Sequence, residues 1–453
     1  MTHPYLPNGA MEVQSEMLEA IGVGSIEELY ADIPDALRLK RPLDMPAGLT
    51  AEQDLVRNVT GLLEANRPIV EGRGFLGHGC YRHFVPAIVD EVIGRSEFLT
   101  AYAGEPYEDH GRFQALFEYQ SLMGELLSCD VVTVPTYDGF QATATALAMT
   151  GRITDRRTVL LVSDALDDKV SRIRDFGAST LDIVSVPTTN GTADLSRVQA
   201  LLGAEVAAVW VESPSATGAI EPELAALAGL AHDAGALLVV GTDPICYGVL
   251  APPAECGADI TAGDIQSLGL HPSYGGARGG FIAVADDPLL VMQLPARLFG
   301  LATTDVSGEY GFGDVAYERT SFARREEGVE WVGTAAALWG IAAGVYLALM
   351  GPVGMAELGE TVLARTRYAQ QGLGAIPGIV LGDPALHFRE FTIDTTGTGV
   401  RASAIVGALN AQGMYPGVAT SDYELLVCVT EVTTQADIDD LIAALAKLVK
   451  ESA

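Results

Sequence analysis

Basic residues are scarce in this sequence of 453 residues. Only 27 lysine and arginine residues stand against 59 aspartate and glutamate residues, so the formal net charge is −32 at pH 7. So acidic a chain repels phosphate backbones, which argues against a protein that binds nucleic acid. The hydrophobic share of 49% is large enough to fill a sizeable core. We therefore expect a soluble cytoplasmic protein with a strongly acidic surface.

Cysteine is also sparse. The five cysteines occur singly, without a Cys-x-x-Cys pair, so the sequence predicts neither a disulfide framework nor a zinc site. Metal-ligating residue types gather between residues 78 and 110, but their spacing matches no metal motif. They are His78, Cys80, His83, Asp90, Asp109 and His110. We expect no bound metal.

Several motifs of nucleotide and hydrolase chemistry are missing. A phosphate-binding P-loop needs Gly-Lys followed by Ser or Thr, and the sequence contains no Gly-Lys. No G-x-G-x-x-G follows a predicted strand, and no Gly-x-Ser-x-Gly occurs. The glycine-rich run 275–280 precedes a predicted strand, which favours a tight turn. The first 22 residues lack a basic head with an apolar core, so we expect no secretory signal.

One uncharged segment, Trp331–Ala356, is long enough to span a bilayer. It is rich in alanine and glycine, and Gly351-Pro352 interrupts it. No cluster of lysine and arginine flanks it to supply a topology signal. The composition therefore favours a buried helix packed closely through small residues, rather than a membrane span.

The hydrophobic pattern divides the chain into three parts. Residues 1–68 form an N-terminal helical segment, residues 69–325 a large domain, and residues 326–453 a long helix with a small C-terminal α+β domain. Short apolar runs alternate with helical ones in the large domain, which predicts a mostly parallel sheet with helices on both faces. The predicted strands are 131–136, 158–163, 183–187, 207–212, 237–242, 259–262 and 280–284 in the large domain, and 388–393 and 424–430 in the small one. The ligand crevice of such a sheet lies beyond the carboxyl ends of its strands.

A large parallel-sheet domain followed by a small α+β domain is also the plan of fold-type I pyridoxal phosphate (PLP) enzymes. These enzymes need a lysine for the Schiff base and an acid that pairs with the pyridinium nitrogen. Asp243 ends a predicted strand and is a suitable acid, with a strand-end or turn residue that binds no cofactor as the alternative. No lysine lies between Asp243 and Lys447, and Lys169 comes well before Asp243. The sequence therefore predicts no covalent PLP, because its four lysines are Lys40, Lys169, Lys447 and Lys450.

Short runs of residues spread over nearly the whole chain carry a family resemblance. They include Tyr5-Leu6-Pro7, Ser25-Ile26-Glu27-Glu28-Leu29, Leu39-Lys40-Arg41-Pro42-Leu43, Tyr81-Arg82-His83-Phe84-Val85-Pro86, Gln114-Ala115-Leu116-Phe117-Glu118-Tyr119-Gln120, Asp243-Pro244 and Val427-Cys428-Val429-Thr430-Glu431. In this order they resemble glycine dehydrogenase (decarboxylating) subunit 1. This subunit is the α chain of the two-chain P-protein of the glycine cleavage system.

The resemblance implies a division of labour between two kinds of chain. In that family two α and two β chains form a heterotetramer, and the β chain holds PLP through a lysine in a His-Lys-Thr context. The α chain has the same fold without that lysine. Here Leu270-His271-Pro272-Ser273-Tyr274 stands at the matching place, so Pro272 takes the position of the lysine. We expect a fold-type I PLP-transferase-like architecture, with PLP held by the partner subunit.

The resemblance also implies roles for particular residues. It predicts no catalytic residue in this chain, and it makes Asp243 and His271 candidates for contact with the cofactor. Candidates for shaping the interface or the shared active site are Tyr102, Glu118, Tyr119, Tyr137 and Asp138. The family reaction decarboxylates glycine at PLP and passes the aminomethyl group to the lipoylated H-protein. We expect the chain to be inactive alone and to act with a β chain, without nucleic acid or membrane.

Three stretches depart from the family pattern, namely residues 103–108, 110–114 and 327–333. The last replaces one cation with two anions. If these stretches reach the shared active site, the chain serves decarboxylation or aldol-type chemistry on another amino acid. Neutral drift in surface loops is the other explanation. A third interpretation is a non-catalytic scaffold or regulatory homodimer that has lost its partner.

Overall fold

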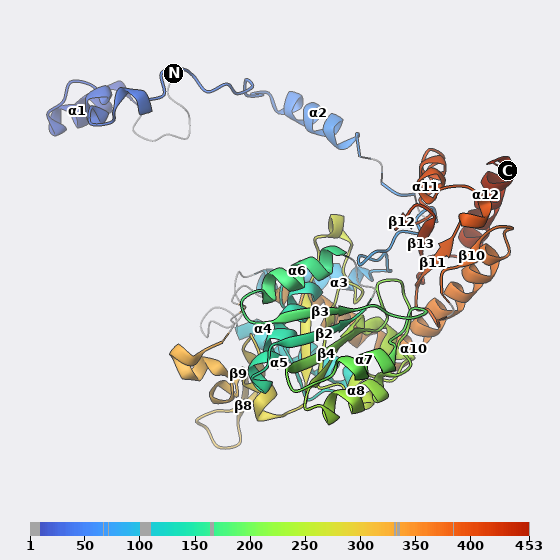
Figure 1. Ribbon diagram of the computed structural model, residues 1–453. Helices are drawn as coiled ribbons and strands as arrows, with labels where there is room; N and C mark the ends of the chain where they lie inside the picture. The colour runs from blue at the N-terminus through green and yellow to red at the C-terminus, as the bar shows by residue number, and fades with distance from the viewer. Residues whose placement is uncertain are drawn as a thin grey trace. The chain divides into compact units, whose positions relative to one another are not determined.

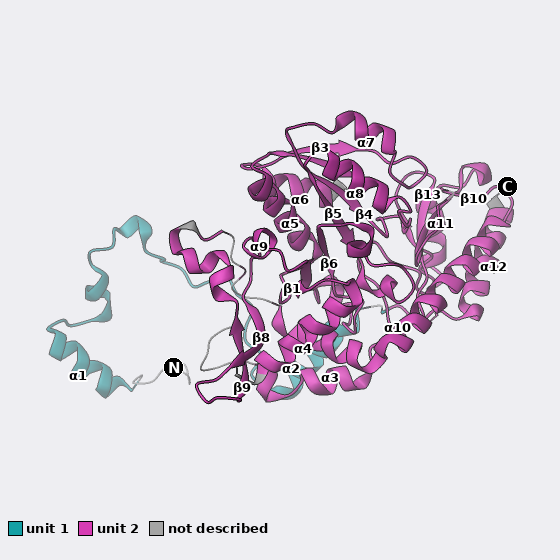
Figure 2. Cartoon of the chain, turned by 90° about the horizontal axis from the view of Figure 1, so that it is seen from below, with its two compact units in different colours: residues 1–68 teal, residues 69–453 magenta. Residues whose placement is uncertain are grey.

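The computed structural model describes residues 10–66, 68–70, 72–99, 110–163, 167–329, 332, 336–383 and 385–452. The chain divides into two compact units, Met1–Pro68 and Ile69–Ala453 (Figure 2). The first unit contains helices α1 (Met11–Ile21) and α2 (Glu52–Leu63) with two short 3-10 turns between them. None of the residues of α1 or α2 is buried, so this unit has no core of its own.

A seven-stranded sheet forms the centre of the described part of the second unit. Its order is β1-β7-β6-β5-β4-β2-β3. The pairs β3–β2, β2–β4, β4–β5 and β5–β6 are parallel, whereas β7 is antiparallel to both β6 and β1. The strands are β1 (Val131–Val132), β2 (Thr158–Val162), β3 (Asp182–Val186), β4 (Val206–Glu212), β5 (Leu237–Thr242), β6 (Ile260–Asp264) and β7 (Gly280–Val284). The mostly parallel sheet that the sequence predicts is confirmed.

Helices cover this sheet on both faces (Figure 1). Successive residues of β4 show why, because Ala208 and Trp210 pack into one buried cluster while Val209 and Val211 pack into another. Alternate side chains of a strand point to opposite faces, so an apolar strand needs cover on both. The helices of this layer arrangement are α5 (Gly139–Thr154), α6 (Asp167–Gly177), α7 (Leu195–Leu201), α8 (Leu224–Asp233) and α9 (Pro288–Val291).

The predicted strand 131–136 is shorter in the structure, where β1 has two residues. Proline has no backbone N–H and so cannot continue a ladder of strand hydrogen bonds at Pro135. Beyond it, Thr136 forms only an isolated bridge with Gly280.

A long helix, α10 (Ala337–Gly374), connects the large sheet to the small one. It is long and apolar enough to cross a membrane by length and composition alone. Its side chains Ala343 and Tyr346 instead pack in a buried cluster with Tyr119 of α4 (His110–Leu127). At Gly344 an added Cβ would lie 3.3 Å from the Cβ of Tyr119, so the small residue allows the two helices to approach closely. The structure therefore shows the buried helix that the composition favours, broken by a non-helical residue at Gly351, beyond which helical geometry resumes as far as residue 374.

The C-terminal part is built on a four-stranded antiparallel sheet of order β10-β11-β13-β12. Its elements are β10 (Val380–Leu381), β11 (Glu390–Asp394), α11 (Ala402–Asn410), β12 (Val418–Ala419), β13 (Glu424–Cys428) and α12 (Gln435–Ser452). Both strands predicted here are present, although β11 begins two residues later and β13 ends two residues earlier than expected. A hairpin of β8 (Leu298–Thr303) and β9 (Tyr310–Val315) was not predicted. Helix α3 (Ala87–Ile93) completes the second unit.

Candidate functional site

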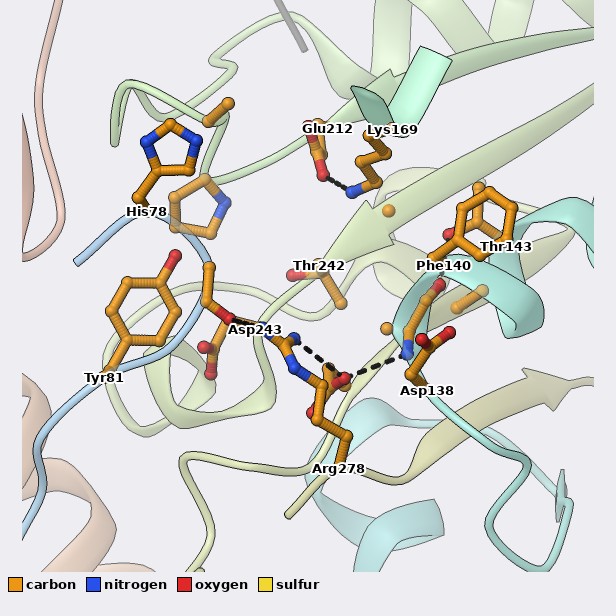
Figure 3. A pocket seen from close by; sticks show the side chains of 18 of the residues that line it. His78, Tyr81, Asp138, Phe140, Thr143, Lys169, Glu212, Thr242, Asp243 and Arg278 are labelled. Carbon is orange, nitrogen blue, oxygen red and sulfur yellow. Dashed lines mark hydrogen bonds and ion pairs between the residues drawn. The ribbon is translucent and has the colours of Figure 1, made fainter. Parts of the chain in front are cut away.

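A cavity of about 530 Å³ lies at the carboxyl ends of β4, β5 and β6, where a parallel sheet is expected to place its ligand crevice. Asp243 and Asp264 line it from two of these strand ends, and Asp138 lines it from the start of α5. Glu390, the first residue of β11, and Arg389 just before it also line the cavity. In Figure 3, His78 and Tyr81 lie on the side of this cavity opposite Phe140 and Thr143.

The amide groups at the start of α5 are bound by carboxylates of the chain itself. Asp138 is the N-cap, and its Oδ1 accepts a hydrogen bond from Gln141 N at 2.7 Å. Gly139 N donates to Asp264 Oδ2 at 2.9 Å, and Arg278 Nη1 lies 3.2 Å from the same oxygen. Burial raises the pKa of Asp264, although Arg278 acts in the opposite direction. The N-terminus of this helix therefore offers neither of these donors to an outside anion.

Asp243 is held by a buried ion pair with Arg389, which comes from the segment just before β11. Ser267 Oγ donates to Asp243 Oδ1 at 2.6 Å, and Ile245 N donates to the same oxygen at 3.1 Å. The Arg389 guanidinium also lies over the ring of Tyr81, 3.2 Å from its centroid. Burial raises the pKa of Asp243, but Arg389 and these hydrogen bonds outweigh burial, and the pKa lies below its ordinary value.

Further buried contacts join the loop 78–84 to the small sheet. Glu390 accepts hydrogen bonds from His78 N and from the hydroxyl of Tyr81, both at 2.7 Å. His83 Nδ1 lies 2.6 Å from Glu431 Oε2, and its Nε2 lies 3.3 Å from Arg389 Nη1. Arginine can only donate, so Nε2 is the acceptor and Nδ1 carries the proton toward Glu431. We call Tyr81, His83, Asp243, Arg389, Glu390 and Glu431 the buried clasp.

Lys169 lies in the cavity, which its position in the sequence did not reveal. Its place well before Asp243 in the chain excluded it from the Schiff-base role in the sequence prediction, and its side chain lines the same cavity as Asp243. It comes from α6 and forms an ion pair with Glu212 at the end of β4 (Figure 3). The parallel pairing of β2 and β4 explains this position, because the segment after β2 and the end of β4 both lie at the carboxyl-terminal end of the sheet.

Residues 271–272 lie outside the lining of this cavity. His271 is more than half exposed, and its Nε2 lies 3.1 Å from both carboxylate oxygens of Asp90. The Pro272 carbonyl accepts a weak hydrogen bond from Cys80 Sγ at 3.9 Å. His271, predicted as a candidate for cofactor contact, therefore makes its ion pair at the surface.

The other predicted site residues take different positions. Tyr137 and Asp138 line the cavity, and Tyr137 is 56% exposed. Glu118 is exposed on α4, where Gln114 Nε2 donates to it at 2.9 Å. Tyr119 is fully buried. Tyr102 lies outside the described residues.

Metal binding finds no support among the residues that the structure describes. No group of three or more His, Cys, Asp and Glu side chains in this part of the chain could hold an ion. His83 and Asp90 belong to separate ion pairs, and Asp109 lies outside the described residues.

Sequence reasoning missed most of the residues that hold the site together. Asp264 ends β6, so the rule that ligands bind at strand ends could have found it, and Arg278 lies in the glycine-rich run 275–280. Arg389 had no such signal, because it follows Asp243 by 146 positions. Its contact with Asp243 depends on how the small sheet packs against the large one.

Comparison with known proteins gives the chain a family. The family model of the glycine cleavage system P-protein matches residues 3–445. The chain belongs to this family. It is 34% identical over 450 residues to the probable glycine dehydrogenase (decarboxylating) subunit 1 of Sulfurisphaera tokodaii, covering 98% of both chains. It is 35% identical over 443 residues to the subunit of the same name from Chlorobium chlorochromatii, covering 96% of this chain and 97% of that one.

Solved structures agree with this assignment. The crystal structure of an inhibitor-bound glycine decarboxylase (P-protein) of the glycine cleavage system matches with a TM-score of 0.84 and 32% identity, covering 98% of this chain and all of the other. Sphingosine-1-phosphate lyase of Burkholderia pseudomallei matches with a TM-score of 0.66 at 15% identity and covers 93% of this chain and 95% of that one, which shows the shared fold alone. The fold-type I architecture expected from the sequence is therefore confirmed.

In the cavity of this P-protein-family chain, two kinds of group that would hold PLP are already bound by the chain itself. The cofactor needs a lysine for its aldehyde, an acid free to pair with its pyridinium nitrogen, and donors for its phosphate. Asp243 is already paired with Arg389, and the amides of Gly139 and Gln141 are bound by Asp264 and Asp138. The chain's own side chains therefore occupy Asp243 and these two amides.

Proposed function

We propose that this chain is the subunit of a two-subunit glycine decarboxylase that does not hold PLP, and that a partner subunit supplies the cofactor and its lysine. The observation that carries the proposal is the match over nearly the whole length to relatives named subunit 1 of glycine dehydrogenase (decarboxylating). The name implies a second subunit. The occupied Asp243 and α5 amides support placing PLP on that partner.

The work of the two chains follows from this division. PLP, bound to the partner, supplies the electron sink for decarboxylation of glycine. This chain contributes a rigid scaffold, since the buried clasp joins its large and small sheets. Tyr137, exposed at the rim of the cavity, is a candidate for contact with the partner. We propose that the assembly is an α2β2 heterotetramer in the cytoplasm, and that lipoylated H-protein accepts the aminomethyl group.

The departures from the family pattern give little support to another substrate. Arg112 and Phe113, within the second departure, are buried, and the ring of Phe113 stacks on Phe299 with 5.0 Å between centroids. Val332, within the third, is buried as well. These three side chains therefore fill the core and do not lie in surface loops. The first departure lies outside the described residues.

The test is reconstitution with a subunit 2 and lipoylated H-protein, followed by exchange of labelled bicarbonate into the carboxyl group of glycine. We expect exchange only when both subunits are present. The controls are each subunit alone with H-protein. A stable PLP-containing complex that exchanges no label would show that glycine is the wrong substrate, and failure to bind any subunit 2 would favour the scaffold or homodimer interpretation.

A further inference from the structure

The cavity contains a charged pair that the proposed function does not use. Lys169 and Glu212 form an ion pair, and their side chains are 25% and 11% exposed. The Lys169 ammonium also lies 5.4 Å from the centre of the Trp210 ring. Both charged residues line the cavity, on the side where β4 and α6 meet (Figure 3). A solvent-exposed pair at a sheet edge contributes little to folding, but this pair is largely removed from water.

The pair is incompletely satisfied as it stands. Glu212 Oε2 is buried and has no hydrogen-bond partner among the described residues. Lys169 covers the carboxylate, and its contact is with the other oxygen, Oε1. A buried carboxylate oxygen without a donor is unfavourable, and a group that brings an N–H or O–H to it is favoured. The ammonium has three donors, so it can also take up a second anionic partner.

From this geometry we propose that the Lys169–Glu212 pair is a binding site for the zwitterionic head of a free α-amino acid. The ligand ammonium binds Glu212, the ligand carboxylate binds Lys169, and the flexible lysine side chain moves from Glu212 to the ligand. Each ion keeps an opposite charge in this exchange, and Glu212 Oε2 gains a donor. No bond is made or broken, so the site binds and does not catalyse.

The size of the cavity is compatible with an amino acid bound at this pair. Gly241 lines the cavity beside the pair. A Cβ there would lie 2.9 Å from the Trp210 ring and 3.2 Å from Glu212 Cγ. Glycine at this position therefore lets β5 lie close against Trp210 and Glu212. The cavity of about 530 Å³ exceeds the size of glycine and accepts larger amino acids. Only the choice of glycine as the first probe rests on the proposed function.

The test is binding of free amino acids to the purified full chain, measured by saturation-transfer NMR and calorimetry without partner or PLP. Glycine, alanine and serine are titrated, with methylamine and acetate as probes that carry one charge each. We expect saturable binding of at least one amino acid, at least tenfold tighter than either single-charge probe. No saturable binding of any of the three, or equal binding of acetate or methylamine, would overturn the proposal.

Substitutions locate the site. Glu212→Gln and Lys169→Met are each expected to weaken amino-acid binding at least tenfold, whereas Lys169→Arg keeps the cation and retains most of it. Lys447→Met is the matched control, because Lys447 is an exposed lysine on α12. Circular dichroism and the melting temperature of each variant show that it is folded. Binding that survives in folded Glu212→Gln contradicts the assignment of the site. That result would leave the proposed function standing, because bicarbonate exchange by the two-subunit complex tests it separately.

Discussion

Arg389 connects the two halves of the candidate site at the level of single residues. Its guanidinium pairs with Asp243, covers the ring of Tyr81 and faces His83 Nε2. The arginine side chain is 4% exposed, so its charge depends on Asp243 for compensation. We interpret Arg389 as the permanent cationic partner of an acid that pairs with a pyridinium nitrogen in PLP enzymes of this fold.

Replacing Arg389 with methionine leaves the Asp243 carboxylate buried with only its hydrogen bonds to Ser267 and Ile245 N. Breaking one side of a buried pair is costly, so we expect a loss of about 3 kcal/mol in the free energy of unfolding, measured with urea. The double variant Asp243→Asn/Arg389→Met removes both charges and is expected to recover at least half of that loss. A loss below about 1 kcal/mol in the single variant would show that the pair does not hold the two sheets together.

The buried clasp also predicts how stability depends on pH. Burial raises the pKa of Glu431, but the hydrogen bonds that it accepts from His83 and from Phe84 N outweigh burial, so the folded-state pKa lies below the ordinary value of 4.5. The unfolded chain then binds more protons, and the stabilisation from Glu431 is present above pH 4.5 and lost as the pH falls through the folded-state value.

Comparison with Glu431→Gln isolates this contribution. At pH 7 we expect the wild type to be more stable by about 2 kcal/mol, since a hydrogen bond to a charged group is lost. The difference should shrink as the pH falls below 4.5. Urea unfolding of both proteins from pH 7 to pH 3 measures it. A difference that stays constant or grows in acid would contradict the assigned ionisation of Glu431.

At the level of elements, the start of α5 shows how the chain's own carboxylates occupy backbone amides that could otherwise bind an anion. Gly139 is the first residue of the helix and packs against β6. A Cβ at this position would lie 2.8 Å from the Cβ of Asp264 and 2.9 Å from its backbone nitrogen. Glycine therefore lets the helix approach closely enough for Gly139 N to donate to Asp264.

Gly139→Ala is expected to lower the free energy of unfolding by about 2 kcal/mol, because backbone atoms of β6 must move to relieve the overlap. Gly229→Ala is the matched control. Gly229 lies inside α8, and a Cβ added there would meet no atom within 4 Å, so alanine should stabilise by about 0.5–1 kcal/mol. Chemical unfolding of both variants tests the pair. A neutral or stabilising Gly139→Ala would contradict the close contact.

Secondary structure was largely predictable from the sequence, and the side-chain contacts of the site were not. Strands β2, β4, β5 and β6 were predictable because they are apolar runs that are almost entirely buried. The β8–β9 hairpin gave no such signal, since Gly300, Gly311 and Gly313 interrupt its pattern. Lys169 and Arg389 reach the cavity through packing between elements distant in sequence. No local sequence pattern predicts such packing.

At the level of the whole molecule, the first unit has no buried residue in either of its helices. The residues of α2 are unburied, although its apolar side chains recur at helical spacing. These are Leu55, Val56, Val59, Leu62 and Leu63. An amphipathic helix is stabilised mainly by packing of its apolar face, so we expect this face to be covered in the complex with the partner.

Val59→Asp places a charge on that face, and Asn58→Asp places the same charge on the adjacent residue as the control. We expect Val59→Asp to reduce co-purification with subunit 2 at least tenfold and to leave the melting temperature of the isolated chain within about 1 °C, as is usual for a surface substitution. Asn58→Asp should change neither measurement. A lower melting temperature of the isolated Val59→Asp chain would show that the face packs within the chain instead.

The central claim is that the partner, and not this chain, holds PLP in the two-subunit enzyme. The most direct measurement is to purify the complex, reduce it with borohydride so that any lysine-bound PLP becomes permanent, and map the modified peptides by mass spectrometry. The account predicts phosphopyridoxyl-lysine on subunit 2 and none on this chain. Stoichiometric modification of Lys169, the lysine that lines the cavity of this chain, would contradict it.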